Sequence, residues 1–114
     1  MYRKIAAQEL AIFLGIIGHP VRIRIIEELR DGELDVSTIQ EKLGETQSKI
    51  SQNLSILKSQ RVVQERKEGR HVFYTLTVPK LAKWLTDGLT LIEEKTTGDR
   101  QVSRAISSAK KKWG

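Results

Sequence analysis

A polar helical pattern that leads directly into a hairpin pattern constrains the fold of this chain more than any other feature. In residues 46–59, the apolar side chains Ile50, Leu54 and Leu57 recur at the spacing of one helix face. A run of β-branched and aromatic residues follows, and it is interrupted at Gly69. The pattern predicts a short helix with one buried face, followed by a β-hairpin that turns at this glycine.

The opposite face of the same helix is rich in serine and glutamine, namely Ser48, Ser51, Gln52, Ser55 and Ser59. Glutamate, lysine and arginine are better helix formers than serine for a face that only meets solvent. Serine and glutamine side chains both donate and accept hydrogen bonds, as contacts with base edges and phosphates require. We therefore favour a DNA-reading face over a merely solvated polar face.

The net charge of +6 is unevenly distributed along the 114 residues. Residues 1–45 carry a net charge of −2, and residues 74–94 carry −1. Residues 46–73, which hold the polar helix and the hairpin, carry +4, and the segment from Lys95 onward carries +5. Positive charge thus coincides with the polar helix, the hairpin and the C-terminal segment, which indicates a polyanionic partner.

The composition excludes several kinds of site. There is no cysteine, so disulfides, thiolate metal sites, iron–sulfur clusters and cysteine redox chemistry are excluded. We interpret His19 as a cap or packing residue and His71 as a surface or backbone-contact residue. The apolar run at residues 10–17 is too short to span a bilayer, and no small-residue cleavage site follows it. We expect one cytoplasmic domain without a cofactor, a metal ion or membrane contact.

Two helices are predicted at the start of the chain. The first covers about residues 2–17, and its second half is apolar on all sides, so both sides of it must be covered. Pro20 suits the first position of the second helix, which continues over residues 21–30 and ends at Gly32 with a left-handed cap. One small domain can cover only one side of the first helix, which predicts contact with a second copy of the chain.

A helix-turn-helix is predicted next. Residues 33–36 form a short extended connection, and Ser37 and Gln40 have the spacing of a capping box that opens a third helix. Gly44 ends this helix, and Thr46 caps the polar helix that follows. The two helices are therefore joined by a short turn that contains Gly44.

The sequence pattern of the C-terminal third of the chain predicts two more helices. Pro79 opens one that extends to about Glu94, and its wide apolar surface is a natural dimer partner for the first helix. Asp99 can cap a last amphipathic helix within a basic tail, residues 95–114. We expect the tail to pack through its apolar stripe and to add non-specific DNA affinity, the alternative being a frayed end without function.

Three phrases of the sequence resemble the ArsR/SmtB family of bacterial and archaeal repressors. They are GHPVRIRII at residues 18–26, QSKISQNL at residues 47–54 and EGRHVFY at residues 68–74. The resemblance implies a mainly α-helical winged helix-turn-helix with a small β-hairpin, over residues 1–94. It also implies a homodimer built from the first and last helices, acting as a sequence-specific repressor on an inverted repeat in double-stranded DNA.

The resemblance assigns roles to individual residues. Four residues of the polar helix fall where family members read bases, namely Gln47, Ser48, Ser51 and Gln52. Others fall where the DNA backbone or the wing groove is met, namely Thr46, Lys49, Asn53, Lys58, Arg66, Lys67 and Arg70. The implied dimer interface contains Leu10, Phe13, Leu14, Ile17, Leu81, Trp84, Leu85 and Leu89.

The chain departs from the family at the positions that bind metals. Some family members carry a Cys-x-Cys pair where this chain has Asp35 and Ser37. Others bind zinc through Asp and His ligands between the last helices of the dimer, yet residues 79–94 contain no histidine. Carboxylates without imidazole are a poor transition-metal site, so no metal site is expected. The sequence does not identify an effector ligand or protein.

Three function classes follow from these observations. The first is a dimeric, sequence-specific transcriptional regulator that acts at the nucleoid, and the second is an architectural or protein-interaction winged helix that binds DNA loosely. A regulator prefers its site over random DNA by roughly 10³ or more, whereas a loose binder shows mainly a steep salt dependence. An enzyme has little support, because the chain lacks cysteine and a glycine-rich phosphate loop.

Overall fold

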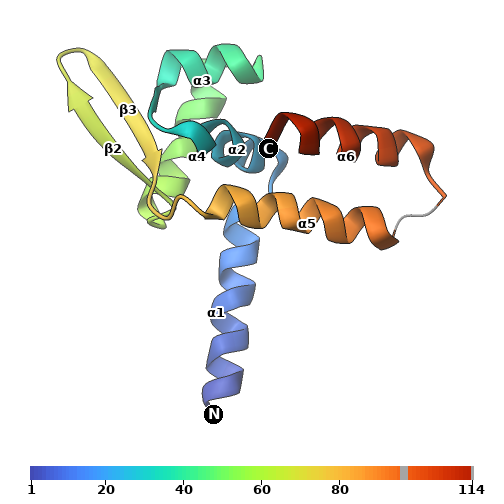
Figure 1. The fold of residues 1–114 in the computed structure, drawn as a ribbon. Helices are drawn as coiled ribbons and strands as arrows, with labels where there is room; N and C mark the ends of the chain where they lie inside the picture. Colours follow the sequence, from blue (N-terminus) through green and yellow to red (C-terminus); the bar gives the residue numbers. More distant parts are fainter. Residues whose placement is uncertain (96–97, 114) are drawn as a thin grey trace.

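The computed structural model describes residues 1–95 and 98–113, and within them it contains six α-helices and one three-stranded antiparallel sheet (Figure 1). In chain order the elements are α1 Tyr2–Ile17, α2 Pro20–Glu28, the 3₁₀ helix η1 Leu29–Asp31, β1 Leu34–Asp35, α3 Val36–Leu43, α4 Gln47–Ser59, β2 Val63–Glu68, β3 His71–Leu76, α5 Leu81–Lys95 and α6 Arg100–Trp113. The predicted fold class, mainly α-helical with a small β-hairpin as the wing, is confirmed.

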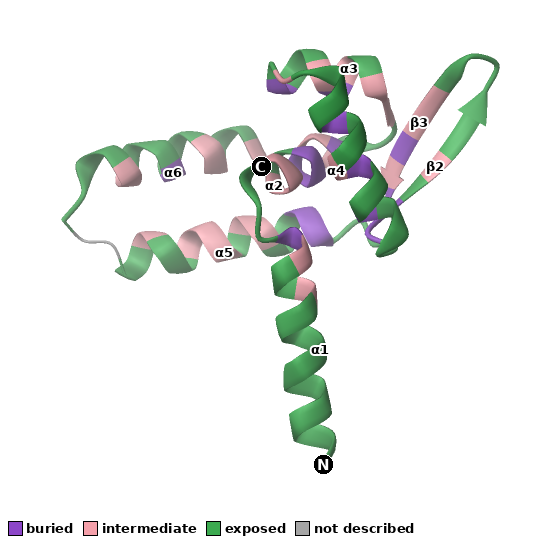
Figure 2. Cartoon of the chain, turned by 180° about the vertical axis from the view of Figure 1, so that it is seen from behind, coloured by how far each residue is buried: buried purple, intermediate pink, exposed green. Residues whose placement is uncertain are grey.

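The core lies where α2, α3 and α4 meet the base of the hairpin. Ile25 and Ile26 from α2, Ile39 from α3 and Leu54 from α4 are fully shielded from solvent. The buried segments in Figure 2 gather at this junction, and the N-terminal end of α5 joins it through Leu81. The core therefore holds α2 against α3 and α4, the two helices of the predicted helix-turn-helix.

Helix α1 projects away from the rest of the molecule. It begins and ends as the apolar pattern predicts, at Tyr2 and Ile17, but only its last turns touch the body (Figures 1 and 2). Ile17 is buried, whereas Leu10 and Leu14 remain about half exposed. None of the helices in the described residues is long and apolar enough to cross a membrane. Much of the apolar surface of α1 is therefore left exposed by the residues that the structure describes.

The hairpin turns where the sequence predicts it. Glu68 pairs with His71, and Gly69 between them has a φ of +60°, in the left-handed region that glycine adopts without steric cost. The structure adds a third strand that the sequence analysis treated only as an extended connection. Leu34 and Asp35 form β1, which pairs with the Tyr74–Phe73 part of β3, so the strand order is β1-β3-β2.

Two predicted helix ends are wrong. The capping box at Ser37 and Gln40 does not form, because the N-cap of α3 is Asp35, two residues before Ser37. The carboxylate of Asp35 accepts the hydrogen bond from the Thr38 amide, at 3.1 Å. Gly32 does not close α2 as a left-handed cap either. The helix ends in the 3₁₀ turn η1, and Gly32 has φ 129° and ψ −161°, a backbone that leads out of this turn toward β1.

The C-terminal helices form an antiparallel pair (Figure 1). Helix α5 begins at Leu81 rather than at Pro79, because Pro79 lies in the turn that the Leu81 amide closes on the Val78 carbonyl. The predicted cap of α6 is confirmed, since the Asp99 carboxylate accepts hydrogen bonds from the amides of Gln101 and Val102 at 3.0 and 3.1 Å. The predicted tail is therefore helical over Arg100–Trp113.

Candidate nucleic-acid interface

Helix α4 is held in one orientation by its buried side. Ile50, Leu54 and Leu57 are all 0% exposed, so the helix cannot rotate without uncovering the core. Its N-terminus is fixed as predicted: Gly44 closes α3 with φ 68°, and the Thr46 hydroxyl accepts a hydrogen bond from the Lys49 amide at 3.2 Å. A rigid helix with one free face follows from these contacts.

The free face of α4 carries all four residues predicted to read bases. The side chains of Gln47, Ser48, Ser51 and Gln52 are exposed on one helix of the helix-turn-helix. Gln47 and Ser51 also line one wall of a cleft of about 460 Å³, and Arg70 and Lys67 of the wing line the other. The structure thus brings the polar face of α4 and the basic tip of the hairpin to one surface.

The wing is braced by ion pairs that sequence reasoning did not find. Arg66 donates to both carboxylate oxygens of Glu33, at 2.9 and 2.6 Å, and it also pairs with Glu68 at 2.6 Å. Its guanidinium lies 4.8 Å from the centre of the Phe73 ring. The hydrogen bond from Arg66 holds the pKa of Glu33 below its ordinary value. Arg66 therefore ties the hairpin to the segment before β1.

Another predicted backbone contact, Lys58, is also engaged within the chain. Its ammonium group lies 2.7 Å from the Glu65 carboxylate on β2, and this hydrogen bond lowers the pKa of Glu65. The Tyr74 hydroxyl donates to the same carboxylate at 3.1 Å. Lys58 thus connects the end of α4 to the wing. By contrast, Lys67 and Arg70 make no ion pair with any residue that the structure describes.

Asn53 links α4 to the end of α1 through a residue that sequence reasoning missed. Its side-chain oxygen accepts a hydrogen bond from Arg22 Nε at 3.0 Å, and its side-chain nitrogen donates to the Lys49 carbonyl at 2.8 Å. Arg22 also donates to the Ile16 carbonyl at 2.8 Å. Arg22 lies within the family-like phrase at residues 18–26, but no local pattern indicates its partner 31 residues away.

Comparison with known proteins is consistent with this geometry. The family model described as bacterial regulatory protein, arsR family, matches residues 19–65, from the cap of α2 to the start of the wing. The biofilm growth-associated repressor of Xylella fastidiosa is 34% identical over 77 residues, which cover 68% of each chain. The chain belongs to the ArsR/SmtB family. Members of this family are DNA-binding transcriptional regulators rather than enzymes, so the chain is a winged-helix DNA-binding regulator of transcription.

One further relative and one solved structure match a larger part of the chain. The HTH-type transcriptional regulator NmtR of Mycobacterium tuberculosis is 31% identical over 84 residues, which cover 74% of this chain and 70% of that protein. The crystal structure of the transcriptional repressor BigR from Xylella fastidiosa superposes with a TM-score of 0.71 at 30% identity, covering 78% of this chain and 91% of that one. The likeness therefore extends to the arrangement of the helices and the wing.

The residues predicted for an ArsR/SmtB dimer interface fall into two groups. Ile17 and Leu81 are buried in the core of the single chain, where they attach α1 and α5 to the body. The others lie at or near the surface, namely Leu10, Phe13, Leu14, Trp84, Leu85 and Leu89. The Phe13 and Trp84 rings are 5.9 Å apart, and apolar pockets of about 430 and 410 Å³ lie beside them. Phe13 and Leu14 of α1 therefore lie beside Trp84 and Leu85 of α5, and together they give the two helices an exposed apolar face.

The carboxylates at the positions where the resemblance implies metal sites in other family members have partners within this chain. Asp35 caps α3, and the hydrogen bond from Thr38 lowers the pKa of its carboxyl group. On α5, Glu93 pairs with Lys110 at 3.1 Å and Asp87 pairs with Lys83 at 3.8 Å. No group of three or more candidate ligands gathers anywhere in residues 1–95 and 98–113. The carboxylates at these positions therefore serve helix capping and ion pairing.

Proposed function

We propose that the chain is a homodimeric repressor that reads an inverted-repeat operator through α4. The observation that carries this proposal is the fixed orientation of α4, whose apolar side is completely buried while Gln47, Ser48, Ser51 and Gln52 all face outward. Glutamine and serine can match the donors and acceptors on base edges in the major groove. Such a protein would act on the chromosome, at the nucleoid of the cytoplasm.

The residues predicted to meet the DNA backbone or the wing groove would then form two groups with different roles. Lys67 and Arg70 at the wing tip would contact phosphates or the minor groove beside the site. Lys49 on α4 would join them, because its pair with Glu45 at 3.4 Å is exposed and therefore weak. Thr46, Asn53, Lys58 and Arg66 already have partners within the chain, so their first role would be to hold α4 and the wing in place. Phosphate contacts by these four would be secondary to their structural contacts.

Dimerisation is part of the proposal because a single α4 covers only one half of an inverted repeat. The exposed apolar face of α1 and α5 supports it, with Leu14 at 46% and Trp84 at 45% exposure. A second copy related by a two-fold axis would cover this face and would present a second α4. The DNA-contacting elements and the pairing surface would thus be separate parts of the same chain.

The alternative proposal, a loosely binding architectural protein, is distinguished by a gel shift. The DNA upstream of the protein's own gene is compared with random duplex of the same length, at two salt concentrations. A regulator is expected to prefer the upstream DNA by roughly 10³ or more. Equal binding to both duplexes, with a steep loss on adding salt, would favour the architectural protein instead.

Replacing Gln52 is expected to change sequence preference as well as affinity. Gln52→Ala removes the proposed base-edge contact, which costs about 1 to 3 kcal/mol of binding, and it should relax the preference at one operator position. Arg70→Ala removes a wing cation and should weaken binding to all sequences alike. Selection of preferred sequences from a random pool measures both effects. An unchanged preference in Gln52→Ala would mean that α4 does not read bases there.

DNA binding is expected to be independent of thiophilic metals. The chain has no cysteine, and the carboxylates at the family's metal positions are engaged in caps and ion pairs. Fluorescence anisotropy with labelled operator DNA should give one affinity in chelator, in micromolar zinc and in micromolar arsenite. A shift of about fivefold or more, the lower end of typical coupling between sites, would contradict this expectation and point to a metal site.

A further inference from the structure

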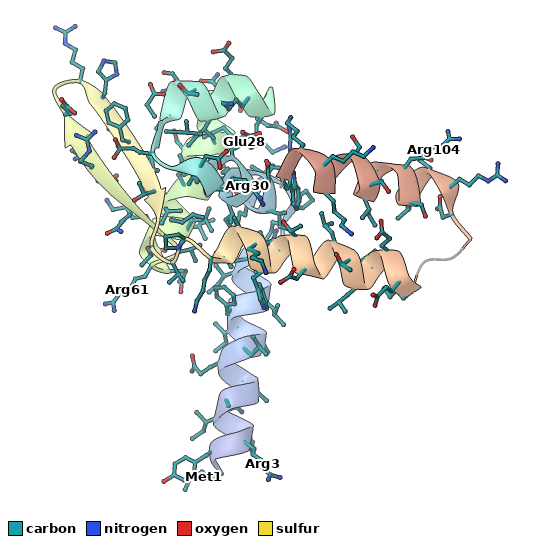
Figure 3. All side chains as sticks on the ribbon, in the orientation of Figure 1. Met1, Arg3, Glu28, Arg30, Arg61 and Arg104 are labelled. Atoms are coloured by element: carbon teal, nitrogen blue, oxygen red, sulfur yellow. The ribbon has the colours of Figure 1, made fainter. Side chains whose placement is uncertain are left out.

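Helix α6 carries a basic surface that the proposed operator reading does not use. Residues 100–113 contain five basic side chains and no acidic one. Arg100, Arg104, Ser107 and Lys111 recur at intervals of three or four residues, so they lie along one stripe of the helix. All four are exposed, and Figure 3 shows Arg104 on the side of α6 that faces away from α5. We call this stripe the outer face of α6. Its polar groups are guanidinium, ammonium and hydroxyl groups, and it contains no carboxylate.

The opposite side of α6 is already occupied by its own chain. Ile106 is buried, and Val102, Ala109 and Trp113 are partly buried. Lys110 pairs with Glu93 of α5 at 3.1 Å, and Lys112 shares a pocket with Glu27 and Glu28 of α2. The apolar stripe is therefore not available to a membrane surface or to a partner helix. The helix is instead packed against its own chain on this side, and its outer face is exposed to solvent.

The charges of the outer face are not neutralised by neighbouring carboxylates. Within the described residues, Arg100, Arg104 and Lys111 take part in no ion pair, whereas Lys110 on the same helix does. Arg104 and Lys111 line a shallow groove with Ser103, Ser107 and Ser108. Arginine, lysine and serine are typical donors to phosphate oxygens. The hydrogen-bond donors and positive charges of this face thus fit the sugar-phosphate backbone of a nucleic acid.

The position of α6 in the fold favours the same DNA that α4 would read. The wing and α6 lie on opposite sides of the unit formed by α2, α3 and α4, as both Figure 1 and Figure 2 show. The molecule is thin in one direction, with extents of 49 × 42 × 22 Å, so the wing and α6 are displaced from α4 by no more than 22 Å along that direction. A helix in the major groove has a phosphate backbone on each side of it. One flank would meet the wing, and the other would meet α6.

We propose that the outer face of α6 is a second, sequence-independent DNA contact, on the flank of α4 opposite to the wing. It binds backbone phosphates through Arg100, Arg104 and Lys111, with Ser107 and Ser108 as additional donors. This inference rests on the proposed DNA reading by α4 for the position of the duplex, but its chemistry does not depend on base recognition. It gives each protomer basic elements on both flanks of the recognition helix.

The test compares two double variants that remove the same charge. Arg104→Ala with Lys111→Ala removes two outer-face cations, and Lys83→Ala with Lys110→Ala removes two lysines that are paired with carboxylates. Binding to upstream DNA and to random duplex is measured from 50 to 200 mM salt. The outer-face variant should lower the salt slope by about 2 for each protomer, and therefore by about 4 for a dimer with both protomers on DNA. Its loss of affinity should then be about 10²-fold larger at 50 mM than at 200 mM. The paired-lysine variant should retain the parent slope.

The outcomes separate this inference from the proposed function. If the full chain does not prefer the upstream DNA, operator reading fails, while the slope on random duplex still tests α6. An outer-face variant with the parent slope on both duplexes overturns the α6 contact. A change in the ratio of specific to random binding would also overturn it, because the contact is sequence-independent. Thermal melting of each variant checks that α6 stays docked.

Discussion

A chain carrying Leu10→Glu and Leu14→Glu is expected to sediment as a 13.0 kDa monomer and to bind its operator about 10²- to 10⁴-fold more weakly than the parent chain. Both leucines lie on α1, at 51% and 46% exposure, so the described part of the chain leaves about half of each side chain uncovered. Two carboxylates at the centre of an apolar interface would be desolvated without partners, which is strongly unfavourable. A monomer would also lose the linkage that makes binding of the second half-site intramolecular.

The control for this experiment is Gln8→Glu, which adds a carboxylate to the opposite side of α1 by helical spacing. It should leave the protein dimeric at micromolar concentration. Circular dichroism should give similar helix content for all three chains, because none of the replaced side chains belongs to the core. If the double variant still sediments as a dimer, the apolar face of α1 is not the pairing surface. A monomeric parent chain would contradict the dimer altogether.

The elements that could be predicted from sequence are those that rest on local patterns. The bounds of α1 and the buried side of α4 follow from apolar spacing, and Gly44 and Gly69 mark turns that need a left-handed backbone. Thr46 and Asp99 were predicted as caps because a short polar side chain precedes each helix. In each case the physical cause lies within a few residues of its effect.

The errors arise where distant segments decide the outcome. Ser37 and Gln40 have the spacing of a capping box, yet Asp35 takes the capping position because its strand is fixed by pairing with β3. A two-residue strand such as β1 has no periodicity of its own, and its partner Tyr74 lies 40 positions further along the chain. The competition between two possible caps is therefore settled by the sheet rather than by local sequence.

The candidate site also has features that follow from local sequence and features that depend on distant segments. The outward position of Gln52 and Ser51 follows from the helical pattern, and the structure places them there. Which cations are engaged within the chain could not be predicted, because Arg66 pairs with Glu33 and Arg22 with Asn53 across more than 30 positions. The apolar residues of α1 and α5 also could not be separated into core and surface until the angle between the helices was known.

Replacing Leu54 by alanine is expected to destabilise the protein by about 2 to 5 kcal/mol, a large part of the 5 to 15 kcal/mol that usually stabilises a domain. Leu54 is 0% exposed at the junction of the core. Its truncation would leave a cavity beneath α4, the helix proposed to read DNA. Ser55→Ala, one residue further and exposed, should change stability by no more than about 0.5 kcal/mol.

Urea unfolding at one fixed protein concentration measures both effects, since a dimer's stability depends on concentration. The Leu54→Ala midpoint should fall while the dependence on urea stays the same. Operator affinity at a temperature where the variant is still folded should also fall, because α4 is no longer held by a full set of contacts. If Leu54→Ala and Ser55→Ala unfold at the same urea concentration, the buried side of α4 does not anchor the helix. The proposed base reading would then lose its main support, because it rests on the fixed orientation of α4.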